Sequence, residues 1–98
     1  MSDFRVTPRA KEDLKNIGHY TLKKWGRKQR DIYLMDLDKR FTWLARNPHI
    51  GKQRPDVQEG YYCFPQGSHL VFYLLRENGI DIIGILHQNM DVQNYFNG

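Results

Sequence analysis

Two amphipathic helix patterns meet at a single glycine, Gly26, and this junction constrains the fold more than any other feature. In the first pattern, the residues that recur in helical steps are Ala10, Leu14, Ile17, Thr21 and Trp25. In the second, they are Leu34, Leu37, Phe41 and Leu44, widened by Ile32 and Tyr33. Thr7-Pro8 is typical of a helix start and Asn47-Pro48 of a helix end. The sequence therefore predicts helices over 8–25 and 27–46, joined as an αα-hairpin.

The remaining segments are β-like. Residues 4–7 are compatible with a short strand, and the runs 61–64, 69–75 and 80–87 are rich in β-branched and aromatic residues. Pro65-Gln66-Gly67 and Asn78-Gly79 are turn signals between these runs, and 50–56 is loop-like. The order β-α-α-β-β-β predicts an α+β fold, a single domain over 1–98 with the helical hairpin packed on a small antiparallel sheet.

The run 70–75 is almost entirely apolar, which favours a central strand buried on both faces. The hairpin would cover one face. The second cover would be the tail after Asp91, which has room for one helical turn, or a partner protein.

Composition excludes several classes of protein. The chain has 98 residues, 40% of them hydrophobic and 27% charged, which fits one small core and argues against disorder. It has no long apolar run and no secretory signal pattern, and its one cysteine, Cys63, cannot form an intramolecular disulfide. The four histidines are not at metal-ligand spacing, and no phosphate-binding glycine loop is visible. We expect a soluble, cytoplasmic protein with no metal and no cofactor.

Charge is distributed unevenly along the chain. Residues 1–54 contain 14 Lys or Arg and 6 Asp or Glu, whereas residues 55–98 contain 1 and 5. The densest basic run, 23–30, has five cations and no acid, and it falls at the predicted hairpin tip. This run has two interpretations. It contacts a partner, which would be nucleic acid or an acidic protein segment, or it is simply a solvated helix surface. For Trp25 we favour an anchor within the helix stripe over an exposed stacking surface.

No catalytic constellation is visible. Ser68 and His69 are neighbours on a predicted strand, so their side chains point to opposite faces and do not form a nucleophile–base pair. We interpret them as a turn-to-strand boundary, and Cys63 as a small core residue.

Short motifs follow one another over residues 4–91. They are Thr7-Pro8, Ala10, Asp13-Leu14, Trp25-Gly26, Leu44-Ala45, Asn47-Pro48, Gly51, Arg54-Pro55, Phe64-Pro65, Gly67-Ser68-His69, Phe72-Tyr73, Ile85-Leu86-His87 and Met90-Asp91. Their order and spacing, together with the order of elements, resemble the ParE branch of the RelE/ParE toxin superfamily of bacterial toxin–antitoxin systems.

The resemblance implies a bacterial cytoplasmic toxin that inhibits DNA gyrase, blocks replication and is not a conventional enzyme. It also implies a hetero-oligomer with a neutralising ParD-like antitoxin, without sequence-specific binding of nucleic acid. Two alternatives stay open: a ribosome-dependent mRNA endonuclease of the RelE branch and a non-toxic antitoxin-binding module. Tyr95, Lys52 and Arg54 are the groups a nuclease would use, but Arg76 is the only Lys or Arg in 57–98, among acidic residues.

The resemblance also suggests two sets of contact residues. An acidic, amphipathic antitoxin segment would bind the basic tip and the apolar strand, through Lys23, Trp25, Arg27, Arg30, Leu70 and Phe72. The gyrase target would be contacted by the closing motif, through His87, Gln88, Met90 and Asp91. A structural role is the alternative for this motif: His87 would close the sheet, Met90 would fill the core edge, and Asp91 would cap a helical turn over 92–96.

Overall fold

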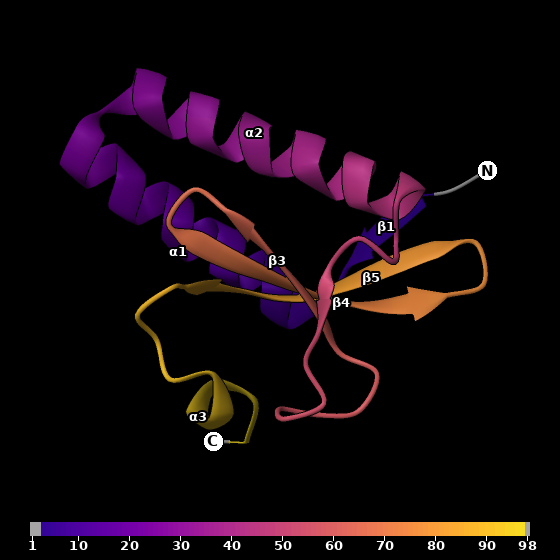
Figure 1. The fold of residues 1–98 in the computed structure, drawn as a ribbon. Coiled ribbons are helices and arrows are strands. Elements are labelled where there is room, and N and C mark those ends of the chain that lie inside the picture. The colour runs from indigo at the N-terminus through magenta and orange to yellow at the C-terminus, as the bar shows by residue number, and fades with distance from the viewer. Residues whose placement is uncertain (1–2, 98) are drawn as a thin grey trace.

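The computed structural model describes residues 3–97 and has the α+β architecture expected from the sequence (Figure 1). In chain order, its elements are β1 (Asp3–Val6), α1 (Pro8–Trp25), α2 (Arg27–Arg46), β2 (Lys52–Gln53), β3 (Tyr62–Gln66), β4 (His69–Arg76), β5 (Gly79–His87) and α3 (Val92–Asn97). No helix within these residues is long and apolar enough to cross a membrane.

Residues at the start of α1 and at the junction of the two helices set the bounds of the hairpin. The Thr7 hydroxyl accepts a hydrogen bond from the Ala10 N–H, and Pro8 occupies the first turn, where it needs no N–H. Gly26 then separates the two helices with φ +93°, a left-handed conformation that an L side chain would strain. The predicted bounds 8–25 and 27–46 are therefore confirmed, and the hairpin extends past the end of the sheet (Figure 1).

The sheet has five strands in the order β1-β5-β4-β3-β2. Strands β3, β4 and β5 form the predicted antiparallel meander. Two features differ from the prediction of a purely antiparallel sheet: β1 pairs in parallel with β5, and part of the expected loop 50–56 pairs with β3 as β2. The parallel pairing brings the chain at Gly79 directly against the backbone of Asp3, which leaves no space there for a side chain.

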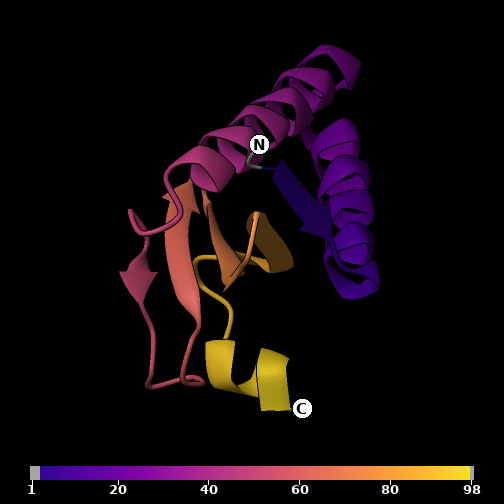
Figure 2. The ribbon, with the colours of Figure 1, turned by 90° about the vertical axis from the view of Figure 1, so that its right-hand side faces the viewer.

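Both faces of the sheet are covered. The hairpin-side core joins the helices to β4 and β5, with Leu37, Phe41, Val71, Tyr73 and Ile82 among its buried members. On the other face, Phe72 and Leu86 pack with α3, whose Val92, Tyr95 and Phe96 complete the α3-side cluster. Figure 2 shows α3 far from the hairpin tip, at the end of the molecule where α1 begins. The prediction of a central strand buried on both faces is confirmed for 71–73, and the tail provides the second cover.

Candidate functional site

A groove of about 860 Å³ lies between the outer half of the hairpin and the adjoining ends of β4 and β5. We call it the hairpin groove. Residues from distant parts of the chain line it, among them Tyr20, Lys24, Trp25, His69, His87 and Met90. Three of these apolar or aromatic side chains are strongly exposed, Tyr20 at 59%, Trp25 at 65% and Met90 at 49%. Apolar surface of this extent, open to solvent beside cationic residues, is typical of a contact site for another macromolecule.

The exposure of Trp25 corrects a prediction. Its helical spacing favoured a place in the buried stripe, but α1 ends at Trp25, where the hairpin has already passed the edge of the sheet. No strand lies beneath the last turn to cover the indole, so the ring lines the hairpin groove instead. The Lys24 ammonium lies 5.6 Å from the centroid of the Trp25 ring and 5.5 Å from that of Tyr20, which gives the rim of the groove a cationic character.

The basic tip is largely uncompensated. Lys23, Lys24, Arg27 and Lys28 are exposed, and none of them forms a salt bridge with an acid within residues 3–97. Arg30 differs, because its guanidinium lies 2.9 Å from the Asp31 carboxylate. The positive potential of the tip therefore comes mainly from the first four cations.

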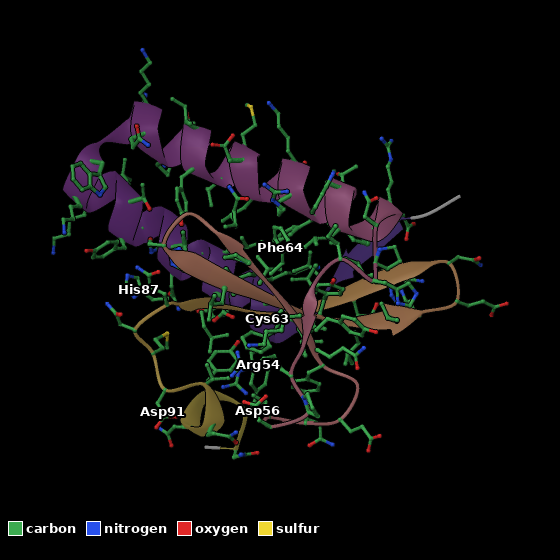
Figure 3. All side chains as sticks on the ribbon, viewed as in Figure 1. Arg54, Asp56, Cys63, Phe64, His87 and Asp91 are labelled. Atoms are coloured by element: carbon green, nitrogen blue, oxygen red, sulfur yellow. The ribbon has the colours of Figure 1, made fainter. Side chains whose placement is uncertain are left out.

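A β-bulge brings His87 into the groove. Ile80 and Ile82 of β5 face the hairpin side, and the register then shifts by one residue opposite Phe72 and Tyr73. After the shift, Ile85 and His87 face the hairpin, and His87 pairs across the sheet with His69. Without the bulge, the period of two along a strand would direct His87 to the α3 face. Figure 3 shows His87 at the end of β5, below the hairpin.

The two histidines form one cluster with Tyr33. The His69 and His87 rings meet edge to face, with centroids 5.5 Å apart, and the Tyr33 hydroxyl lies 2.6 Å from His69 Nδ1. Burial lowers the pKa of His69, and the neighbouring His87 lowers it further. His69 is therefore neutral at physiological pH.

The predicted antitoxin residues are only partly brought together. Lys23, Trp25 and Arg27 lie at the exposed tip, and Arg30 is next to them but paired. Leu70 and Phe72 belong instead to the α3-side cluster, and the Phe72 side chain is fully buried, 5.2 Å from the Phe96 ring centroid. Because this ring has no exposed surface, Phe72 is removed from the candidate surface, whereas Leu70 is partly buried beside the α3-side cluster and does not line the hairpin groove.

Two of the four predicted target-contact residues line the groove. His87 and Met90 line it, and Gln88 is exposed while its backbone N–H donates to Ser68 O. The expectation that Met90 fills the core edge is wrong, because its side chain is half exposed. Asp91 has the expected structural role, since its carboxylate accepts a hydrogen bond from the Asn94 N–H at the start of α3 (Figure 3).

Asp13 is an organising residue that sequence reasoning missed. Its carboxylate accepts hydrogen bonds from the Ile85 N–H and from the Tyr95 hydroxyl, so it connects α1 to β5 and α3. Arg9 adds to this connection by donating to the Tyr95 carbonyl, with its guanidinium 3.8 Å from the centroid of the tyrosine ring. Burial raises the pKa of Tyr95, and the hydrogen bond to Asp13 raises it further.

Two arginines at the sheet are neutralised by aspartates. Arg54 forms a two-pronged pair with Asp56 beside the buried Cys63 (Figure 3). Arg76 Nη2 lies 2.8 Å from the Asp3 carboxylate. Within residues 3–97, no group of three His, Cys, Asp or Glu side chains is placed to hold a metal ion.

Comparison with solved structures identifies the fold class. A chain of the chromosomal ParDE TA system from P. aeruginosa superposes with a TM-score of 0.75, covering 89% of this chain and 96% of that one, at 18% identity. The hairpin on a mixed five-stranded sheet is therefore a RelE/ParE-like fold.

Sequence comparison identifies the family. The family described as ParE toxin of type II toxin-antitoxin system, parDE, matches residues 4–92. Toxin ParE1 of Mycobacterium tuberculosis is 36% identical over 92 residues, which cover 93% of this chain and 94% of the relative. Toxin ParE1 of Caulobacter vibrioides is 33% identical over 93 residues, which cover 95% and 96%. The chain belongs to the ParE toxin family of type II toxin–antitoxin systems.

Proposed function

We propose that this toxin inhibits DNA gyrase and thereby blocks replication, and that a ParD-like antitoxin neutralises it in a hetero-oligomeric complex. One observation carries the proposal: the hairpin groove combines the cationic, aromatic tip with His87 and Met90 of the closing motif. An antitoxin segment on the tip would therefore also cover the surface proposed for the target. Neutralisation is then direct competition for one groove.

The groove suits an acidic, amphipathic segment. Its apolar side would contact Tyr20 and Trp25, and its carboxylates would lie near Lys23 and Arg27. Such a segment need not be folded beforehand, because a wide contact area compensates for the entropy lost when it becomes ordered.

The arrangement of charges argues against the RelE-type nuclease. RNA cleavage needs free cations at the developing phosphorane and a group that activates the 2′-hydroxyl. Arg54 and Arg76 are paired with aspartates, which leaves Lys52 as the one cation of this set without a salt bridge within residues 3–97. The Tyr95 hydroxyl is bound to Asp13 with a raised pKa, so it stays protonated. Because gyrase acts on DNA, we place the toxin's action in the bacterial cytoplasm, with residues 1–98 acting as one domain.

Purified toxin is expected to trap gyrase on cleaved plasmid DNA in the presence of ATP, and adding the antitoxin in equimolar amount should abolish this effect. Ribosome-dependent cleavage of mRNA is measured in parallel, and we expect no cleavage there. Cutting of mRNA with unaffected gyrase would assign the chain to the RelE mechanism. Inactivity in both assays, with the antitoxin still bound, would leave only the non-toxic binding module.

Charge reversal at the tip should weaken antitoxin binding. In the double variant Lys23→Glu with Arg27→Glu, we expect the affinity to fall about 10- to 100-fold at 50 mM salt, because two attractive contacts become repulsive. The difference from wild type should shrink towards 500 mM salt. Lys39→Glu with Arg46→Glu changes the net charge equally on an exposed part of α2 remote from the groove, and it serves as the control. Equal losses in the two double variants would show that net charge, not the tip, drives binding.

A further inference from the structure

The hydrogen bonds around Tyr33 determine which nitrogen of His69 carries a proton. The Tyr33 oxygen accepts a hydrogen bond from the Ser68 N–H at 3.2 Å and has one hydrogen to donate. Its nearer acceptor is His69 Nδ1 at 2.6 Å, and Gln66 O at 3.3 Å is the second choice. We assign the Tyr33 hydrogen to the shorter of these two contacts, which makes His69 Nδ1 the acceptor and places the hydrogen of the neutral ring on Nε2.

The same reasoning applies to His87. Its Nδ1 accepts a hydrogen bond from the Asn89 backbone N–H at 3.2 Å, so the neutral ring also has its hydrogen on Nε2. Two imidazole N–H donors thus occupy directly paired positions on β4 and β5, and both rings line the hairpin groove. A pair of neighbouring donors is complementary to the two oxygens of a carboxylate.

The contacts of Tyr33 leave room for a second proton on His69. If His69 is protonated at Nδ1, the Tyr33 hydroxyl can turn to donate to Gln66 O and accept from Nδ1 instead, so every group keeps a partner. Burial keeps His69 neutral in the free toxin, so a proton on its ring requires a bound counter-charge, and the Tyr33 oxygen then provides the partner for that proton.

The charged and titratable groups that face His69 are few. Tyr33 faces it from α2 and His87 from β5, while Asp13 of α1 acts on it favourably but is already bound to the Ile85 N–H and Tyr95 hydroxyl. Lys24 lines the same groove from α1. A carboxylate entering here thus meets two N–H donors in a groove that also contains the Lys24 ammonium, which is the charge complementarity expected for an acidic partner.

We propose that His69 and His87 form a subsite for one carboxylate of the antitoxin, and that His69 takes up a proton when this carboxylate binds. The inference rests on the proposed antitoxin complex and specifies its chemistry. The free toxin holds His69 neutral, and the carboxylate favours the imidazolium. The complex then holds more protons than the separate proteins, so the affinity rises as the pH falls between the pKa of bound and of free His69. The rise amounts to at most about tenfold per pH unit and levels off below that range.

The test is calorimetric titration of the full-length toxin with its ParD-type antitoxin between pH 5.5 and 8, in two buffers with different ionisation enthalpies. The wild type should take up protons, at most one per complex, with the largest uptake at a pH between the pKa values of free and bound His69. His69→Gln keeps an N–H donor but cannot take up a proton, so uptake should vanish and the affinity should lose its rise towards low pH. Tyr33→Phe should reduce uptake, since it removes the acceptor for the Nδ1 proton. His49→Gln, at an exposed histidine outside the groove, is the matched control and should keep full uptake.

The partner carboxylate is located by changing the acidic residues of the antitoxin's toxin-binding segment to amides one at a time. One such change should reproduce the loss of proton uptake seen with His69→Gln. Binding without proton uptake in the wild type, undiminished uptake in His69→Gln, or no effect of any amide substitution would each overturn the inference while leaving the antitoxin complex in place. If no complex forms at all, the proposed function itself fails.

Discussion

Replacing Gly79 with alanine should lower the Tm by about 15 °C, the largest stability loss we expect from one methyl group in this chain. A Cβ at this position would stand 1.9 Å from the Asp3 carbonyl oxygen, and the obstacle is backbone, which cannot rotate away. The strand β1 would have to separate from β5, exposing Phe4 and Val6 from the hairpin-side core. A loss of about 3 kcal/mol is reasonable for such overpacking, and it corresponds to this shift in Tm for a domain of this size.

Gly18→Ala is the matched control, because it adds the same methyl group at a buried glycine inside α1. Its Cβ would lie 3.4 Å from a Leu34 methyl group, the flexible end of a side chain. Alanine is also favoured over glycine in a helix by about 1 kcal/mol, so this variant should keep or raise the Tm. Thermal unfolding followed by circular dichroism measures both variants. A Tm for Gly79→Ala within about 3 °C of wild type would contradict the close contact between β1 and β5.

The helices were the most predictable part of the fold, because their signals are local. The cap at Thr7-Pro8, the glycine at Gly26 and the stop at Asn47-Pro48 lie within a few residues of the boundaries that they set. The pairing of β1 with β5 is different, since it joins residues 76 positions apart, such as Phe4 and Ile80. No local pattern specifies the direction of such a pair, and a short strand beside a helix hairpin is compatible with either direction.

The hairpin groove was predictable only in part. The basic run at the tip is visible in the sequence, but the exposure of Trp25 depends on how far the hairpin extends past the sheet. The pairing of His69 with His87 also cannot be predicted from the spacing of residues in the sequence. A regular hairpin closed by the turn Glu77-Asn78 would pair His69 with Leu86, and only the bulge in β5 moves His87 opposite His69. Gly84, which follows the extra residue of β5, was the one sequence signal for this bulge.

Apolar content alone misled the search for a partner surface on the sheet. The run that contains Leu70 and Phe72 suggested a strand open to a partner, but the aromatic residues of α3 already cover it. Tyr95 and Phe96 come from a six-residue helix whose position depends on Asp13 and Arg9, far away in the sequence. The contacts that bury Phe72 are therefore long-range, and its spacing along the strand says nothing about them.

Trp25→Ala should reduce the affinity for the antitoxin by about 30-fold or more while leaving the Tm within about 3 °C of wild type. An exposed tryptophan beside cations is typical of a binding hot spot, where truncation costs about 2 kcal/mol or more. Its removal costs little in the free toxin, because 65% of the side chain is already in solvent. The affinity is measured by calorimetry and the Tm by circular dichroism on the same preparations.

The second tryptophan of the chain separates binding from folding. Trp43 is 36% exposed and packs between Phe64, with ring centroids 5.3 Å apart, and the guanidinium of Arg40 at 4.6 Å. Trp43→Ala should therefore lower the Tm by about 10 °C, a loss of about 2 kcal/mol, and change the affinity by less than threefold below the unfolding transition. The two variants should thus show opposite patterns although they delete the same side chain. A loss of stability in Trp25→Ala would contradict the exposure of this side chain. Equally weakened binding in Trp43→Ala would show that the antitoxin surface extends beyond the hairpin groove.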